Sequence, residues 1–154
     1  MKQLPLNYWN KVALVDDVDF ENLSKVKWRV AKRSERYYAI TGTGKDSRLL
    51  HRIITACPKG MEVDHIDRNG LNNQRSNLRV VTSSENKMNR GKTKHNTSGY
   101  KGVRLNKGIW VAEISINHKH IYLGSFNTKE EAALAYNNGA IKHHGQFAYQ
   151  NVIV

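Results

Sequence analysis

Residues 60–90 read GMEVDHIDRNGLNNQRSNLRVVTSSENKMNR. Two β-rich runs, Glu62–Ile66 and Leu78–Val81, flank a segment, Asp67–Ser76, that is rich in loop-forming residues. Thr82–Glu85 has the Thr-x-x-Glu pattern of a capping box, which starts a helix with Asn86 in its first turn. The order strand, long loop, strand, helix is therefore predicted for this stretch.

Folding of this outline is expected to bring Asp64, His65 and Asn86 together. Carboxylate and amide oxygens are hard ligands that favour Mg²⁺, Mn²⁺ or Ca²⁺ over Zn²⁺, and two such ligands leave positions for water and a phosphate oxygen. A neighbouring histidine is suited to accept a proton from water near neutral pH. Together these groups predict hydrolysis of a phosphodiester. The alternative is that Asp64 and His65 are ordinary surface residues.

Charge and length limit the classes of protein that the chain can belong to. It has 154 residues, enough for one ordinary domain or two small ones, and a formal net charge of +12, which favours a polyanionic partner. A soluble basic protein and a ribosomal or histone-like packaging protein are the alternatives. No stretch approaches the roughly 18 apolar residues of a membrane span, so no membrane partner is expected. A lone cysteine, Cys57, excludes a disulfide framework and multi-cysteine zinc sites, and an N-terminus without an apolar run favours an intracellular protein.

The whole string from Val63 to Asn86 resembles the motif of the HNH nucleases, the ββα-metal fold of phage and bacterial DNA endonucleases. The resemblance implies that His65 is the general base and that Asp64 and Asn86 bind the metal. It also implies that Asn77, twelve residues after His65, ties the loop together and helps to hold the histidine. Asn89 is an alternative to Asn86 at the last position of the motif.

The same resemblance implies one divalent cofactor, Mg²⁺, with Mn²⁺ also accepted. The ion would bind the scissile phosphate and stabilise the departing 3′ oxygen, leaving 5′-phosphate and 3′-hydroxyl ends. Asp67 is expected to cap the loop rather than to bind the ion. No small-molecule substrate is expected, and the protein would act as a monomer or a homodimer.

Upstream of the motif, the sequence alternates short strands and helices. We expect a strand at Val12–Val15, a short helix beginning within Asp19–Leu23, and a hairpin formed by Trp28–Ala31 and Tyr37–Ile40. This hairpin is a candidate for the sheet on which the nuclease motif rests. Arg48–Ile54 reads as a helix with an N-cap at Asp46 or Ser47. Arg52 and its neighbour His51 are candidate phosphate contacts near the cut, and packing of this helix on the core is the alternative.

The C-terminal part reads as three strands and a helix. The strands are predicted at Tyr100–Leu105, Trp110–Ile116 and His120–Phe126, with turns at Asn106–Gly108 and Asn117–Lys119. The capping box Thr128–Glu131 then starts an alanine-rich helix that Gly145 ends.

This part resembles the ethylene-response-factor (Apetala-type) DNA-binding domain, which lays a three-stranded sheet, backed by one helix, in the major groove. The resemblance implies DNA contacts or supporting roles at Lys101, Arg104, Asn106, Trp110, Glu113, Ser115 and Tyr122. Packing is the alternative for Trp110 and Tyr122. Fewer arginines stand on this face than in the plant domains, so a different base preference is expected.

Between the two parts, the stretch from residue 86 to residue 112 has no acidic residue. Its basic residues Lys87, Arg90, Lys92 and Lys94 are candidate contacts with DNA phosphates. We therefore predict an α+β chain with an HNH nuclease domain at 1–93, whose ββα core spans about 60–90, a basic linker at 94–98, and a DNA-binding domain at 99–154.

The predicted function is that of a metal-dependent endonuclease on double-stranded DNA, of the homing type. It would act in the cytoplasm of a bacterial host or a phage-infected cell. A restriction-type HNH nuclease and a DNA-binding regulator with an inactive nuclease half are the alternatives. An RNA-binding protein is disfavoured because no RNA-module signature is present.

Overall fold

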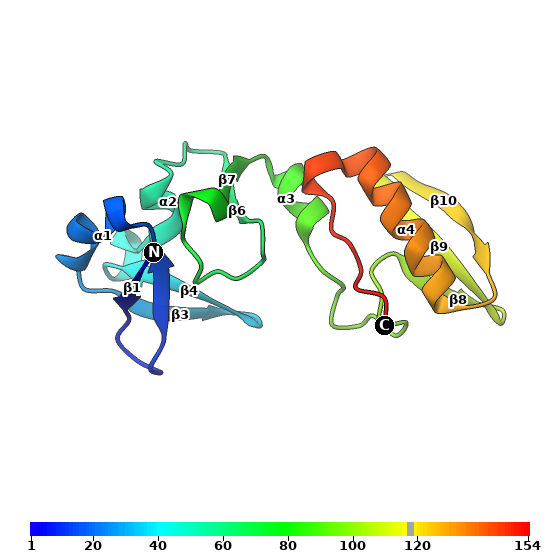
Figure 1. The fold of residues 1–154 in the computed structure, drawn as a ribbon, viewed down its shortest axis with the longest axis horizontal. Helices are drawn as coiled ribbons and strands as arrows, with labels where there is room; N and C mark the ends of the chain where they lie inside the picture. The colour runs from blue at the N-terminus through cyan, green and yellow to red at the C-terminus, as the bar shows by residue number, and fades with distance from the viewer. Residues whose placement is uncertain (117–118) are drawn as a thin grey trace. The chain divides into compact units, whose positions relative to one another are not determined.

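The computed structural model describes residues 1–116 and 119–154, and the chain divides into two compact units, Met1–Asn86 and Lys87–Val154 (Figure 1). Each unit mixes small antiparallel sheets with helices, as the sequence predicts. No helix in these described ranges is long and apolar enough to cross a membrane.

The N-terminal unit begins with the antiparallel strands β1 (Lys2–Pro5) and β2 (Val12–Val15), followed by the helix α1 (Asp17–Ser24). A second sheet has the order β3 (Arg29–Arg33), β4 (Arg36–Thr41) and β5 (Arg48–Leu49). The predicted strand at Val12–Val15, the short helix and the hairpin are confirmed.

The prediction of one helix over Arg48–Ile54 is wrong at its start. Arg48 and Leu49 pair with Thr41 and Ile40 of β4 as the short strand β5, and the helix α2 covers only Leu50–Ile54. The residue before α2 is Leu49, which makes no side-chain cap, so the predicted cap at Asp46 or Ser47 is also wrong. Pairing with β4 supplies hydrogen bonds that the local sequence does not reveal.

The motif region folds as the strands β6 (Glu62–His65) and β7 (Leu78–Val81), which pair antiparallel, and the helix α3 (Ser83–Asn89). A short 3₁₀ turn, η2 (Arg75–Asn77), precedes β7, and another, η1 (Gly44–Asp46), precedes β5. The capping box is confirmed, because Thr82 N–H donates to the Glu85 carboxylate and Glu85 N–H donates to Thr82 Oγ1. The predicted order of elements is therefore present.

One hydrophobic core joins these small sheets and helices. The core contains residues from β1, β2, α1, β3, β4, α2, β6 and β7, so the small sheets of the unit share one core with its helices. Its buried members are Leu4, Leu6, Ala13, Val15, Leu23, Trp28, Val30, Ala39, Leu50, Ile54, Val63 and Leu78. Burial of this apolar surface stabilises the unit and fixes β6 at its place in the core.

The C-terminal unit is a three-stranded antiparallel sheet with a helix packed on one face. The strands are β8 (Val103–Asn106), β9 (Ile109–Ile116) and β10 (Lys119–Phe126), in the order β10-β9-β8. Strand β8 starts later than predicted because Gly102, with φ +73°, interrupts the extended chain. The predicted turn at Asn117–Lys119 has its residues 117 and 118 outside the described residues.

The helix α4 (Lys129–His144) starts at a complete Thr128–Glu131 capping box and ends at Gly145, as predicted. It is followed by the short turn η3 (Gly145–Phe147). Small residues of α4, Ala132 and Ala133, pack on Val103 and Ala112 of the sheet. The chain end returns to this core, where Asn151 N–H donates to Asn137 Oδ1 at 2.7 Å and Asn137 Nδ2 donates to the Asn151 carbonyl at 2.9 Å.

Candidate functional site

The long loop between β6 and β7 is tied together by Asn77. This buried side chain donates from Nδ2 to Asp67 Oδ1 at 2.9 Å and to the Asn72 carbonyl at 2.8 Å. Its Oδ1 accepts from Asp67 N–H at 3.0 Å. Asn77 thus satisfies backbone and side-chain groups on both ends of the loop, which is the role that the sequence predicts for it.

Asp67 caps the loop. Its carboxylate accepts from Asn69 N–H and from Asn72 Nδ2, each at 2.8 Å, as well as from Asn77. Partial burial acts to raise the pKa of Asp67, but these hydrogen bonds and the nearby His65 outweigh it and hold the pKa below its ordinary value. The carboxylate is used inside the loop, in agreement with its predicted role as a cap.

Strand β2 and the residue after it, Asp16, bind the same loop through hydrogen bonds, which the sequence did not predict. Leu14 N–H donates to the Leu71 carbonyl at 2.8 Å, and Asn73 N–H donates to the Leu14 carbonyl at 2.7 Å. Asp16 accepts from Arg75 N–H at 2.8 Å. The pairing of β2 with the loop is long-range, so no local pattern announces it.

His65, the predicted general base, is at the end of β6 and is only 6% exposed. Its Nε2 lies 3.5 Å from Oδ1 of the fully buried Asn73. Burial lowers the pKa of His65 below 6.5, and the Asn73 contact and the carboxylates of Asp67 and Asp64 only partly oppose it. The ring is therefore neutral at pH 7, which is the form that accepts a proton.

A second histidine, His51 of α2, packs against the first. The two rings meet edge to face with centroids 4.9 Å apart, and the Tyr38 ring lies 5.7 Å from His51 and 6.0 Å from His65. Burial, then His65, Arg52 and Arg33, lower the pKa of His51 to about 3. His51 Nδ1 is buried and, within the described part of the chain, has no hydrogen-bond partner.

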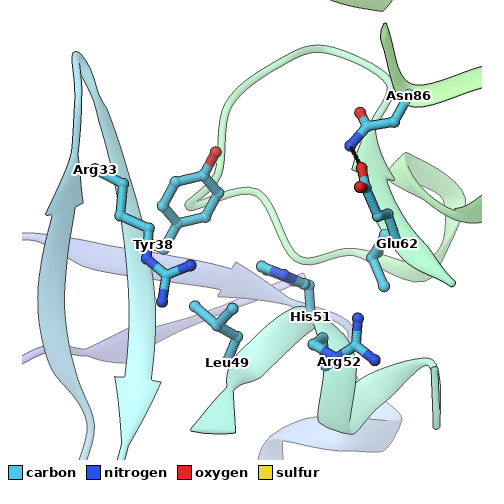
Figure 2. A pocket seen from close by; sticks show the side chains of 8 residues that line it. Arg33, Tyr38, Leu49, His51, Arg52, Glu62 and Asn86 are labelled. Atoms are coloured by element: carbon cyan, nitrogen blue, oxygen red, sulfur yellow. Dashed lines mark hydrogen bonds between the residues drawn. The ribbon is translucent and has the colours of Figure 1, made fainter. Parts of the chain in front are cut away.

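The two predicted metal ligands, Asp64 and Asn86, have different neighbours. Asp64 is 5% exposed, and its Oδ2 accepts from Arg79 Nε at 2.8 Å and Arg79 Nη2 at 2.6 Å, directly across the β6–β7 pair. Asn86 donates from Nδ2 to the Glu62 carboxylate. This bond turns the amide oxygen of Asn86 away from Glu62, as Figure 2 shows.

A cavity of about 240 Å³ opens beside Glu62 and Asn86, and Asp64 and His65 are not among the residues that line it. Figure 2 shows Arg33 and Tyr38 on the hairpin side, His51 and Arg52 from α2, and Glu62 with Asn86 opposite the hairpin. Asn86 lines this cavity, whereas Asn89 is buried within α3. Leu49 and Val63 complete the lining.

Arg52, the predicted phosphate contact of α2, is used within the protein. Its guanidinium donates to the Met61 carbonyl at 2.9 Å, the Pro58 carbonyl at 3.1 Å and the Cys57 carbonyl at 3.3 Å. These bonds fix the turn that leads from α2 into β6. The packing alternative therefore describes Arg52 well, although its charge still faces the cavity.

In the C-terminal unit, the strand register sorts the predicted DNA contacts by face. Side chains directly opposite in an antiparallel pair share a face, and alternate residues of one strand point the same way. Ala112 of β9 packs on α4, so its neighbours Val111 and Glu113 point to the other face. Arg104 is directly opposite Val111, and Tyr122 is directly opposite Glu113, so both pairs lie on the face away from α4. The predicted residues on this outward face are Arg104, Asn106, Glu113, Ser115 and Tyr122.

Arg104 and Glu113 form an ion pair across this face. Arg104 Nη2 donates to Glu113 Oε1 at 2.7 Å and Nε donates to Oε2 at 3.2 Å. The hydrogen bond from Arg104 lowers the pKa of the Glu113 carboxyl. The pair therefore holds the Arg104 guanidinium against the sheet.

Two predicted contacts lie elsewhere in the unit. Trp110 is on the opposite face and packs with the core under α4. Lys101 precedes β8, and its ammonium donates to the Met88 carbonyl at 2.7 Å and lies 5.3 Å from the Tyr149 ring centroid. The position of Trp110 agrees with the packing alternative, whereas Lys101 makes polar and ring contacts within its own unit.

The acid-free stretch is exposed at its four predicted basic positions, Lys87, Arg90, Lys92 and Lys94. The predicted linker also contains ordered contacts, because Ser98 is 3% exposed and donates to the Val103 carbonyl at 2.8 Å. Asn96 Nδ2 donates to the Tyr100 carbonyl at 2.8 Å. Polar bonds thus anchor a segment that has no apolar residue to anchor it.

Comparison with known proteins finds HNH endonucleases and, over a smaller share of the chain, plant transcription factors. The family model for HNH endonucleases matches residues 48–88. An uncharacterised HNH endonuclease of Acanthamoeba polyphaga mimivirus is 34% identical over 134 residues, which cover 85% of this chain and 70% of the relative. Protein 3.8 of Escherichia phage T7 is 38% identical over 93 residues, covering 59% of this chain and 76% of that protein.

A partial similarity covers a smaller share of each chain. An ethylene-responsive transcription factor of Arabidopsis thaliana is 44% identical over 68 residues, which cover 39% of this chain and 42% of the plant protein. The similarity to the viral protein over 85% of this chain and the family match at residues 48–88 agree with the motif read from the sequence. The chain belongs to the HNH endonuclease family.

Proposed function

We propose that this chain is a metal-dependent DNA endonuclease in which His65 activates the attacking water. The observation that carries the proposal is the buried, neutral His65, whose ring packs on His51 inside the segment that the HNH family model matches. His51 in turn lines the cavity that Glu62 and Asn86 also line. The strands β6 and β7 and the helix α3 would form the ββα-metal unit.

The side chains at the site suit one hard divalent cation. Asp64 would offer its carboxylate, of which Oδ2 also accepts from Arg79. Asn86 would offer its amide oxygen, which the hydrogen bond from its Nδ2 to Glu62 leaves turned away from Glu62. Such oxygen donors favour Mg²⁺, and Mn²⁺ by the same chemistry. When bound, the ion would supply positive charge at the phosphate and at the leaving oxygen.

The proton transfer falls to His65. The neutral ring takes a proton from water, the water oxygen bonds to phosphorus, and the bond from phosphorus to the 3′ oxygen breaks. The departing 3′ oxygen takes a proton from a second water molecule. The products carry a 5′-phosphate and a 3′-hydroxyl. Asn77 acts as a positioning residue because it holds the loop, and Asn73 because its Oδ1 lies 3.5 Å from Nε2 of the His65 ring.

We propose that the outward face of the C-terminal sheet binds duplex DNA. A pair such as Arg104–Glu113 presents a preoriented guanidinium, and Asn106, Ser115 and Tyr122 add polar groups beside it. The partial similarity to an ethylene-responsive transcription factor of Arabidopsis thaliana supports this assignment. The exposed residues Lys87, Arg90, Lys92 and Lys94 would contact phosphates.

The proposed organisation is a nuclease domain at 1–93, a basic linker at 94–98 and a DNA-binding domain at 99–154, acting as a monomer or homodimer. Joined to a domain that reads sequence, such a nuclease fits a homing endonuclease, with a restriction-type enzyme as the second candidate. A regulator with an inactive nuclease half is the candidate from another class. The neutral, buried His65 argues for the active enzyme.

The test is cleavage of supercoiled plasmids that carry random inserts, with Mg²⁺ or with EDTA, by the wild-type chain and His65→Ala. We expect Mg²⁺-dependent product from the wild type alone, and the ratio of nicked to linear DNA separates homing-type from restriction-type action. Gel shifts with both proteins provide the binding control. Tight binding by the wild type with no cleavage of any bound sequence would favour the regulator.

A further inference from the structure

We propose that Arg33 and Arg36, at the end of the β3–β4 hairpin, form a phosphate-binding wall and hold a DNA phosphodiester in the cavity beside His51. The assignment rests on the proposed nuclease function and adds to it two positioning residues from outside the matched HNH segment. It gives the hairpin a role in the reaction.

The strand register puts the two arginines on one face of the hairpin. Arg33 is directly opposite Arg36, and Ala31 is directly opposite Tyr38, so these four side chains share a face. Lys32 is opposite Tyr37 on the other face, where its ammonium lies 5.8 Å from the Tyr37 ring centroid. Arg33 and Lys32 are neighbours in β3 and therefore lie on opposite faces of the hairpin.

The face that bears the arginines is the one that covers the two histidines. The Tyr38 ring contacts His51 and His65, and Arg33 lines the cavity together with Tyr38 and His51 (Figure 2). The loop between β6 and β7 packs closely on the Tyr38 ring, because a Cβ on Gly70 would lie only 2.6 Å from Cδ1 of Tyr38. The hairpin is therefore held at the site by close packing.

The positive charges of Arg33 and Arg36 favour an anionic ligand at this wall. Within the described residues, Arg33 has no salt bridge and no side-chain hydrogen bond, and like charges directly opposite on a sheet are destabilising. The positive charges of Arg33 and Arg36 contribute to the lowered pKa values of His51 and His65, after burial as the main cause. A bound phosphate would relieve this repulsion and accept from the guanidinium fork.

The size and opposite wall of the cavity narrow the ligand. About 240 Å³ is below the roughly 300–1,000 Å³ of pockets for drug-sized ligands, so the space suits one phosphodiester group rather than a nucleotide. Glu62 and Asn86 stand opposite the arginine wall. A phosphate held by Arg33 would then face Asn86, one of the residues that would hold the cation.

The first arm of the test measures single-turnover cleavage of duplex DNA with Mg²⁺. We expect Arg33→Gln to slow cleavage about tenfold to hundredfold and Arg33→Lys to restore part of the rate. Lys32→Gln removes the same charge from the opposite face and is expected to stay within about twofold of wild type. Because Arg33 is exposed, thermal melting of all variants should match the wild type.

The second arm does not depend on cleavage. The histidine ring NMR signals of the full chain are followed in EDTA while the phosphodiester thymidylyl-(3′→5′)-thymidine is added. We expect His51 signals to shift in the wild type, in Arg33→Lys and in Lys32→Gln, but not in Arg33→Gln. This readout reports on phosphate at the wall even for a protein that cuts no DNA.

Together, the two arms distinguish failure of the arginine wall from failure of the proposed nuclease function. Cleavage by the wild type, with Arg33→Gln as active as Lys32→Gln and with equal His51 shifts, would overturn the arginine wall and leave the nuclease intact. Arg33-dependent shifts without any cleavage of bound DNA would support the phosphate site and overturn the nuclease. Neither cleavage nor Arg33-dependent shifts would overturn both.

Discussion

Replacing His51 by Phe should flatten the acid dependence of stability of the N-terminal unit. The folded protein holds the pKa of His51 at about 3, against 6.5 in the unfolded chain, because the ring is buried beside His65, Arg52 and Arg33. As the pH falls, the unfolded chain therefore takes up a proton that the folded chain refuses. The free energy of unfolding must drop with falling pH below about 6.5.

The magnitude follows from the pH interval. Each pH unit below the unfolded pKa costs about 1.4 kcal/mol, so going from about pH 7.5 to about pH 5 costs about 2 kcal/mol through His51 alone. The figure is the same for any folded pKa below about 4, because the folded ring is then neutral at both values. Phenylalanine keeps the ring contacts with Tyr38 and His65 and removes the titration.

The assay is urea unfolding at both pH values in EDTA, followed by tryptophan fluorescence in a Trp110→Phe background. The remaining signal comes from Trp9 and the buried Trp28, both in the N-terminal unit. His95→Phe is the matched control, since this exposed histidine lies outside that unit. Equal losses of stability on acidification in the wild type and in His51→Phe would refute the reasoning.

Three further substitutions probe the loop and the C-terminal unit. Asn77→Ala removes three hydrogen bonds from the buried loop, so urea unfolding should show a loss of about 2 kcal/mol or more; an unchanged midpoint would show that the loop does not need the amide. Gly102→Ala places a Cβ 2.6 Å from the Glu113 carbonyl at φ +73°, so the free energy of unfolding should fall by about 3 kcal/mol. Gly108→Ala is the control, because its Cβ meets nothing within 4 Å, and it should lower the free energy of unfolding by about 1 kcal/mol. Equal losses for the two variants would rule out the clash. Asn151→Ala leaves Lys101 N–H and C=O without their partners and should lower stability by about 2 kcal/mol, measured by calorimetry, while a loss below about 0.5 kcal/mol would mean that water replaces both bonds.

Local patterns were sufficient for much of the fold. Strand β7 and the capping boxes at Thr82 and Thr128 follow from residues close in sequence, and they are where the patterns predict them. The short strand β5 was missed because Arg48 and Leu49 form a strand only by pairing with β4. Its signal lies in a distant partner and not in its own residues.

The candidate site divides in the same way. The role of Asn77 was predictable, since the motif places it at the end of a loop that needs closing. The Arg79 partner of Asp64 depends on the register of β6 with β7, and the contact of His51 with His65 depends on how α2 packs. The arginine wall depends on which face of the hairpin covers the histidines, and only the folded chain shows this.

The most direct test of the central claim is a rate measured on DNA that is already bound. The wild-type chain and His65→Ala are each bound to a duplex that both retain in a gel shift, and Mg²⁺ is then added to start the reaction. We expect the wild type to yield ends with a 5′-phosphate and a 3′-hydroxyl, and His65→Ala, bound equally well, to yield none. Cleavage by both proteins at the same rate would contradict the assignment of His65 as the base, and cleavage by neither would contradict the nuclease itself.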